Sequence, residues 1–236
     1  MHIKAVLPSS LIEYPGHIAD VVYVGTCNFR CPYCHNVELV VCPERLPDLD
    51  EAQVLRGLAS RAGFVDGLVV TGGEPTLQAD VVDFMRKAKR LGVAVKLDTN
   101  GYRPDVLERC LAEGAVDYVA MDVKSSLAKY AKACGVPADP ERLLASIHLI
   151  LSAPIEHEFR TTVVPTLVEL EDVEAIVQLI AGARRYFLQC FRPGKTVSWT
   201  DADAMPPPST ELLRGMANLA ALHIPEVGIR NLPQGG

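Results

Sequence analysis

Three cysteines lie close together in the segment GTCNFRCPYCHN, residues 25–36. Cys27, Cys31 and Cys34 have the spacing C-x3-C-x2-C. Three thiolates on one loop can hold zinc or an iron–sulfur cluster. Cys31 and Cys34 also form the C-x-x-C pattern of a redox-active dithiol. The spacing therefore leaves three kinds of site open.

The three kinds of site differ in the number of protein ligands that they need, and this number can be compared with the residues available. Structural zinc takes four protein ligands, and the fourth would have to be His35 or the more distant Cys42. A dithiol would leave Cys27 without a role. A four-iron cluster held by three thiolates keeps one iron free to bind a small molecule. Ligand count thus favours a cluster over zinc, and zinc over a dithiol.

The composition is typical of one compact globular unit, with 49% hydrophobic and 22% charged residues in a chain of 236. A net charge of −6 disfavours a nucleic acid partner, because phosphate binding needs a basic face. No apolar run approaches the roughly 20 residues that span a bilayer, and the N-terminus lacks a signal-peptide pattern. We therefore expect a cytoplasmic protein with no membrane partner. Clustered cysteines there more often serve metal or redox chemistry than disulfides.

Short β-branched runs alternate with segments of helical period, as in strand–helix units around a parallel sheet. Six units predict an α/β fold, a partial (βα)6 barrel that is open on one side. We expect a single domain over residues 1–236, with a core at about 18–200 and a C-terminal extension at about 201–236. The predicted strands are residues 21–26, 67–73, 94–101, 117–124, 158–165 and 186–191. Among the predicted helices, residues 77–92 place one apolar face at Leu77, Val81, Phe84, Ala88 and Leu91.

Residues that could do chemistry follow the first four predicted strands. In parallel sheets with helical crossovers, ligands bind at the carboxyl ends of the strands. Cys27 follows the first strand, and GGEP (residues 72–75) follows the second. DTNG (98–101) and DVK (122–124) stand at the ends of the third and fourth. We expect these segments to meet at one site.

Two motifs together resemble the radical S-adenosylmethionine (SAM) superfamily. The first is C-x3-C-x2-C with the aromatic residue Tyr33 directly before Cys34. The second is TGGEP, residues 71–75, at the end of the second strand. The resemblance implies a [4Fe–4S] cluster and SAM as cofactors. Glycine is common at any strand-to-helix turn, so GGEP carries this information only in combination with the cysteines.

Longer segments resemble the activating enzymes of glycyl radical enzymes, especially those of anaerobic ribonucleoside-triphosphate reductase. These segments are SLIEYPGHIADVVYVGTCNFRCPYCHN, KLDTNG and YVAMDVKS. They extend to about residue 165, and the C-terminal third matches only loosely. The resemblance implies reductive cleavage of SAM to a 5′-deoxyadenosyl radical, which would install a glycyl radical on a partner enzyme. It also implies a flavodoxin- or ferredoxin-type electron donor.

The resemblance assigns roles to residues of this chain. Three irons of the cluster would be bound by Cys27, Cys31 and Cys34. The amino and carboxylate groups of SAM would chelate the fourth iron. Residues along the cofactor would be Tyr33, Cys34 and His35. Residues that meet its amino group would be Gly72, Gly73 and Glu74. No separate catalytic acid or base is implied, since the radical is generated by the cluster and SAM.

Further roles concern charge. Asp98, Thr99 and Asp122 match residues that hold a monovalent cation beside SAM in related activating enzymes, and Lys124 matches a lysine that faces its carboxylate. Neighbouring carboxylates do repel unless a cation offsets them. Alternatively, the two aspartates cap the helices that follow. Phe191 stands where those enzymes have a histidine near the ribose, which departs from their pattern.

Other residues and functions remain open in the sequence. Cys42 is expected to be an inert thiol, and Cys190 is a candidate to face the site from a strand end. Arg160 is expected either to point into the barrel towards a carboxylate or to form a structural ion pair. An alternative function is a radical SAM enzyme acting on a small molecule or on another glycyl radical enzyme. A noncatalytic zinc or iron–sulfur module would have no use for GGEP.

Overall fold

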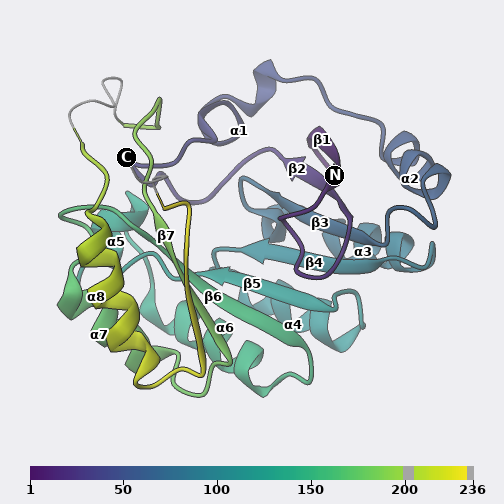
Figure 1. The fold of residues 1–236 in the computed structure, drawn as a ribbon. Helices are drawn as coiled ribbons and strands as arrows, with labels where there is room; N and C mark the ends of the chain where they lie inside the picture. The colour runs from purple at the N-terminus through teal and green to yellow at the C-terminus, as the bar shows by residue number, and fades with distance from the viewer. Residues whose placement is uncertain (199–204, 233–236) are drawn as a thin grey trace.

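An eight-stranded sheet organises the chain (Figure 1). The computed structural model describes residues 1–198 and 205–232. The strands follow one another across the sheet in chain order. They are β1 Ile3–Ser10, β2 Ala19–Val24, β3 Gly67–Gly72, β4 Ala94–Thr99, β5 Tyr118–Asp122, β6 Glu156–Val163, β7 Arg185–Cys190 and β8 Glu226–Arg230.

The sheet is an open barrel, as predicted. Strands β2 to β8 pair in parallel, whereas β1 pairs with β2 in the antiparallel direction. Strands β1 and β8 are the two edges of the sheet, and within the described residues they do not pair with each other. The six predicted strands correspond to β2 to β7. The two edge strands complete the sheet on either side.

Both edge strands have weak sequence signals. In β1, irregular register and mixed exposure obscure the alternation typical of a strand. Strand β8 has only five residues, EVGIR, and lies in the predicted C-terminal extension. Gly228 in β8 allows close packing, because a Cβ there would lie 2.7 Å from the Phe187 ring. Edge strands contribute few buried residues, so an apolar pattern does not reveal them.

The helices connect successive strands and lie around the outside of the curved sheet (Figure 1). They are α1 Val37–Val41, α2 Glu51–Ser60, α3 Val81–Lys89, α4 Pro104–Ala112, α5 Tyr130–Cys134, α6 Pro140–Ser152, α7 Leu170–Leu179 and α8 Thr210–Ala221. Helix α3 is shorter than the predicted 77–92. Leu77 belongs to a 3-10 turn before α3, and Leu91 lies beyond its end. None of the described helices is long and apolar enough to cross a bilayer.

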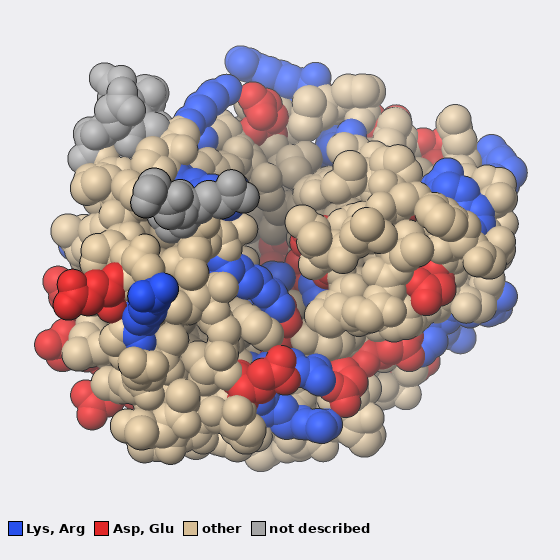
Figure 2. All heavy atoms as spheres, viewed as in Figure 1, with Lys and Arg blue, Asp and Glu red and all other residues tan. Residues whose placement is uncertain are grey.

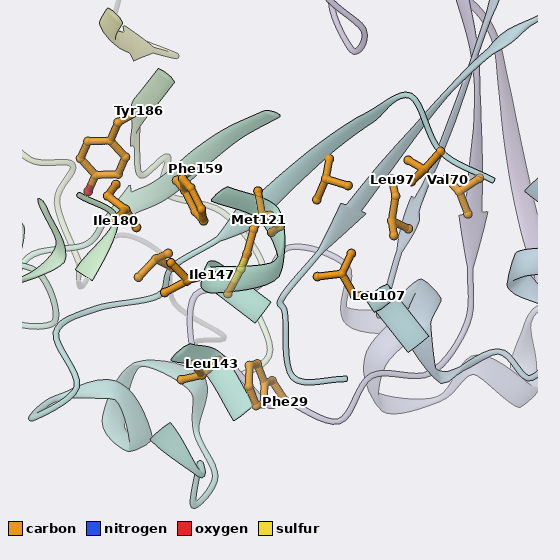
Figure 3. Packing of buried hydrophobic residues seen from close by; sticks show 14 of the residues in the cluster. Phe29, Val70, Leu97, Leu107, Met121, Leu143, Ile147, Phe159, Ile180 and Tyr186 are labelled. Atoms are coloured by element: carbon orange, nitrogen blue, oxygen red, sulfur yellow. The ribbon is translucent and has the colours of Figure 1, made fainter. Parts of the chain in front are cut away.

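The main core fills the space between the sheet and the helices. Figure 3 shows Leu97 of β4 and Met121 of β5 on the same side of the sheet as Leu107 of α4. Because successive strand residues point to opposite faces, the neighbouring Asp98 and Asp122 point into the barrel. A smaller cluster that includes Tyr14, Val21, Val69, Tyr118 and Ala120 packs on that inner face. The outer face thus carries the main core, and the inner face carries both this smaller cluster and the charged residues.

Truncation of Leu107 tests the main core. Leu107 is fully buried, so Leu107→Ala should lower the free energy of unfolding by about 2–5 kcal/mol through lost burial and a cavity. Leu222→Ala is the matched control, because Leu222 is 80% exposed and its truncation should change stability by less than about 0.5 kcal/mol. Urea titration followed by circular dichroism measures both. Equal losses in the two variants would contradict this packing.

Candidate functional site

A cavity of about 320 Å³ opens at the carboxyl ends of the parallel strands. Figure 2 shows this face hollowed near its centre, with charged side chains of both signs in the hollow. The cavity brings together every residue predicted for the site. These are Cys27, Cys31, Tyr33, Cys34, His35, Gly72, Gly73, Glu74, Asp98, Thr99, Asp122 and Lys124. Segments separated by up to 97 positions in the chain (27 to 124) therefore meet here.

The cysteine loop begins where β2 ends. Thr26, at φ 77°, turns the backbone into the left-handed region directly before Cys27. The amide of Cys34 donates to the carbonyl of Cys31 at 3.0 Å, and the amide of Phe29 donates to Cys27 Sγ at 3.4 Å. These contacts form a tight turn that presents the three thiols to the same cavity.

The donor chemistry of the three thiols suits an iron–sulfur cluster, although no group of three or more His, Cys, Asp or Glu side chains among the described residues is arranged to hold a single metal ion. All are free, and burial raises the pKa of Cys27 to about 12 and that of Cys31 to about 11. Bound metal supplies the positive charge that stabilises such sulfurs as thiolates. The hydroxyl of Tyr33, which lines the cavity, is also buried without a hydrogen-bond partner in the part of the chain that the structure describes. A group seated in the cavity would account for the thiols and for this hydroxyl.

The two glycines of GGEP let β3 end against the cysteine loop. Gly72 has φ 123°, and a Cβ there would lie 2.4 Å from the Val24 nitrogen. A Cβ on Gly73 would lie 2.0 Å from the Thr26 carbonyl oxygen. The close approach permits hydrogen bonds from Gly73 N to Val24 O at 2.9 Å and from Glu74 N to Thr26 O at 2.8 Å. Glycine is therefore needed here for backbone contact.

Glu74 joins the ends of β3 and β4. Its Oε1 accepts from the Thr76 amide at 3.0 Å, the Thr76 hydroxyl at 2.5 Å and the Thr99 hydroxyl at 2.7 Å. Its Oε2 accepts from the Asn100 amide at 2.7 Å. Burial raises the pKa of this carboxyl, although the hydrogen bonds oppose the shift. Oε2 accepts only this one of the four bonds, which leaves it acceptor capacity for an ammonium group.

Charged side chains from β4, β5 and β6 form a network in the cavity floor. Arg160 Nε donates to Asp122 Oδ1 at 2.8 Å, and Arg160 Nη1 donates to Asp98 Oδ2 at 3.2 Å. Lys96 binds Asp98 Oδ1, and Lys124 binds Asp122 Oδ2 at 2.9 Å. Arg160 therefore points into the barrel and bridges the two aspartates. This agrees with the expectation that its side chain would point towards a carboxylate. Neither aspartate side chain caps any of the described helices, since the helices that follow begin after Arg103 and Lys129, so the alternative helix-capping interpretation is wrong.

The network holds both aspartates ionised. Burial acts to raise the pKa of each carboxyl, but the neighbouring cations outweigh it. Arg160 and Lys96 hold the pKa of Asp98 below its ordinary value, and Arg160 and Lys124 do so for Asp122. The cavity floor thus carries fixed charges of both signs.

The cavity wall at the end of β7 contains residues whose roles the sequence left open. The Phe191 ring stacks on His35, with centroids 6.0 Å apart and planes at 13°. Cys190 lines the cavity, whereas Cys42 follows α1 away from it. Asn100, from the predicted DTNG segment, and Thr162 also line it, although the sequence assigned neither of them an individual role. Their positions at the ends of β4 and β6 were the available signal.

The family of the chain follows from its sequence as well as from this site. Residues 21–180 match the family model of the Radical SAM superfamily, so the chain belongs to this superfamily. It is therefore an enzyme of the class that uses a [4Fe–4S] cluster and SAM. Solved relatives of similar fold contain these groups, a cluster in TsrM of Kitasatospora setae and bound SAM in anSMEcpe.

Similarity to one relative extends over nearly the whole chain. A protein of Methanocaldococcus jannaschii, provisionally named glycyl-radical enzyme activating enzyme MJ1227, is 33% identical over 98% of this chain and 96% of its own length. A protein of Pyrococcus horikoshii, provisionally named a GTP 3′,8-cyclase, is 37% identical over 39% of this chain but only 29% of its own length.

Solved structures share the fold at low sequence identity. SuiB of Streptococcus suis, bound to its precursor peptide SuiA, superposes with a TM-score of 0.68 at 14% identity. That match covers 88% of this chain and 48% of SuiB. HemN of Escherichia coli gives 0.59 at 16% identity, covering 88% of this chain and 52% of its own. These similarities concern the fold alone.

Addition of one methyl group at Gly73 should disrupt the contact between the two loops. Gly73→Ala places a Cβ against the Thr26 carbonyl and should lower the free energy of unfolding by about 1–3 kcal/mol. Gly215→Ala is the matched control: Gly215 lies exposed in α8 with open space around it, so alanine should stabilise by about 0.5–1 kcal/mol. Urea unfolding measures both, and a neutral Gly73→Ala would refute the steric argument.

Replacement of Cys34 should reduce iron binding. After anaerobic reconstitution, the parent protein should hold about four irons per chain, and Cys34→Ala should hold fewer because the cluster loses one of three thiolates. Cys42→Ala is the control, since it removes a thiol that lies outside the cavity lining. Iron and sulfide assays, with visible absorption, give the content of each variant. Equal loss from Cys42→Ala would contradict the assignment of Cys34.

Proposed function

We propose that this enzyme installs a glycyl radical on a partner enzyme, and that the partner is an anaerobic ribonucleoside-triphosphate reductase. The observation that carries the proposal is the near full-length similarity to the M. jannaschii protein named as a glycyl-radical enzyme activating enzyme. Similarity to the cyclase stops at 39% of this chain. The open side of the barrel, between β1 and β8, supports the proposal because a protein loop needs an unobstructed entry.

The proposal gives the cavity residues binding roles. Cys27, Cys31 and Cys34 hold the cluster, and when bound, the cluster and SAM supply a carbon radical that removes a hydrogen atom. Residues that position SAM are Tyr33, Cys34, His35, Gly72, Gly73, Glu74, Asp98, Thr99, Asp122 and Lys124. The role of Glu74 rests on the remaining acceptor capacity of its Oε2, and that of Lys124 on its ammonium group, which would face the SAM carboxylate.

The chain also shields the reaction from water. Tyr33 is 6% exposed and Phe191 is 1% exposed, and both line the cavity. The stack of Phe191 on His35 forms a flat wall between the cysteine loop and the end of β7. In the proposed complex, these side chains exclude solvent from a reactive radical. Phe191 therefore contributes shielding where related activating enzymes place a histidine.

The proposed function also requires an electron donor and a cellular location. Reductive cleavage consumes one electron, for which we propose a flavodoxin- or ferredoxin-type donor. We place the reaction in the cytoplasm. All seven cysteines are free thiols in the structure, which agrees with a reducing compartment.

A second candidate function is radical chemistry on a small molecule. This alternative requires polar residues from the C-terminal third of the chain at the cavity, and Gln189, Arg192 and Asn231 do line it. Their amide and guanidinium groups could bind a polar substrate. The partial similarity to the GTP 3′,8-cyclases points in the same direction.

One experiment separates the two functions. The reconstituted enzyme is mixed anaerobically with SAM, a chemical reductant and an anaerobic ribonucleoside-triphosphate reductase, and the reductase is examined by electron paramagnetic resonance. We expect a glycyl radical signal and 5′-deoxyadenosine with the parent protein and with Cys42→Ala, and neither with Cys34→Ala. The reductase with its radical glycine changed to alanine is the partner control. Formation of 5′-deoxyadenosine without a glycyl radical would refute this partner.

A further inference from the structure

A buried arginine occupies the centre of the cavity floor. Arg160 lies in β6, where it is the register partner of Asp122 in β5. Its side chain is 9% exposed and its guanidinium reaches across β5 to Asp98 in β4. A planar guanidinium can bridge two carboxylates in this way because its N–H donors point in fixed, separate directions. We define the Arg160 network as Lys96, Asp98, Asp122, Lys124 and Arg160.

Every carboxylate oxygen in this network already has a cationic partner. Asp98 Oδ1 and Oδ2 accept from Lys96 and Arg160, and Asp122 Oδ1 and Oδ2 accept from Arg160 and Lys124. The third group of the predicted cation site, the Thr99 hydroxyl, donates to Glu74 and accepts from the Gly101 amide. The predicted ligands of a monovalent cation are therefore committed to the protein itself.

The charge balance also disfavours an added cation. The Arg160 network contains three cations and two anions, a net charge of +1. The neighbouring Glu158 carboxylate, whose Oε1 lies 3.9 Å from Arg160 Nη1, does not change this balance, because Arg230 binds it through two hydrogen bonds of 2.7 and 2.8 Å and adds a matching positive charge. A potassium or sodium ion between Asp98 and Asp122 would raise the local charge to +2 in a partly buried site. The residues present do not fit that ion.

We propose that Arg160 takes the place of the monovalent cation: it neutralises Asp98 and Asp122 from within the chain, so that SAM binds without potassium or sodium. This inference rests on the proposed assignment of the cavity to SAM. Arg160 acts here as a positioning residue. It shares Asp122 with Lys124, whose ammonium uses one of its three donors on that aspartate within the described residues. The other donors are left for the SAM carboxylate.

The first test needs no variant. SAM is titrated calorimetrically into the anaerobically reconstituted enzyme, without any partner, in potassium chloride, sodium chloride or tetramethylammonium chloride at equal ionic strength. The dissociation constants should agree within about twofold, because a ligand not linked to a cation shows no coupling to it. Binding that is tenfold or more tighter in potassium would overturn the inference and leave the proposed function standing. Absence of SAM binding in all three salts would overturn both.

Removal of the Arg160 guanidinium should make the affinity for SAM depend on potassium. In tetramethylammonium chloride, Arg160→Gln should bind SAM about tenfold or more weakly, since the buried Asp98 and the partly buried Asp122 lose a charged hydrogen-bond partner. Lys124 would then be held more strongly by Asp122 and would be less available to the SAM carboxylate. Potassium should restore several-fold of this loss. Arg184→Gln is the matched control, because Arg184 is 66% exposed and pairs with Glu156 away from the cavity. It should bind SAM equally in all salts.

A compensating double variant keeps the inference testable if Arg160→Gln folds poorly. Asp98→Asn combined with Arg160→Gln removes one negative charge together with the positive charge. The double variant should bind SAM more tightly than Arg160→Gln in tetramethylammonium chloride and should gain little from potassium. Iron content and circular dichroism confirm that each variant is folded. Equal affinity of Arg160→Gln and the parent protein in tetramethylammonium would overturn the inference, as would potassium rescue of the double variant to the same extent.

Discussion

The buried carboxylate of Glu74 holds together the strand ends on which the site depends. It receives hydrogen bonds from Thr76, Thr99 and the Asn100 amide, while its own amide donates to Thr26 before the first cysteine. A buried carboxylate is costly unless hydrogen bonds offset its burial, so its donors must stay in place. The cysteine loop, the GGEP turn and the end of β4 therefore form one unit. Each motif is positioned by the other two.

The residues inside the barrel are stabilised differently from those outside it. Apolar residues such as Leu97 and Met121 pack under the helices, and their chain neighbours Asp98 and Asp122 face inward. Burial of several charges in one small space is tolerable only when they compensate one another. Arg160 provides that compensation for two strands at once. The resulting floor carries fixed charges of both signs with a net charge of +1, which suits the carboxylate of the cofactor.

Several features of this chain were predictable because they are local. The spacing of Cys27, Cys31 and Cys34 and the GGEP turn identify the family, and β-branched runs identify β2 to β7. Other features depend on weak or distant signals. Strands β1 and β8 lie at sheet edges with little buried apolar surface, and α3 starts late because Pro75 to Leu77 forms a separate turn. Nothing in the sequence around Asn100 and Thr162 distinguishes them from other polar residues, because only the positions of their strands bring them to the cavity.

The sequence by itself determined which chemical groups the chain can bring to a cofactor, because thiol spacing and glycine-rich turns are properties of short segments. Only the tertiary structure decided how those groups share their charges. Arg160 is 38 residues from Asp122 and 62 from Asp98 in the chain, and the pairing of β5 with β6 brings it into contact with both. Sequence separation says nothing about such contacts, since they arise from strand order and register. The same pairing joins Asp98 and Asp122 through one guanidinium, and our proposal that Arg160 replaces a bound cation rests on that contact.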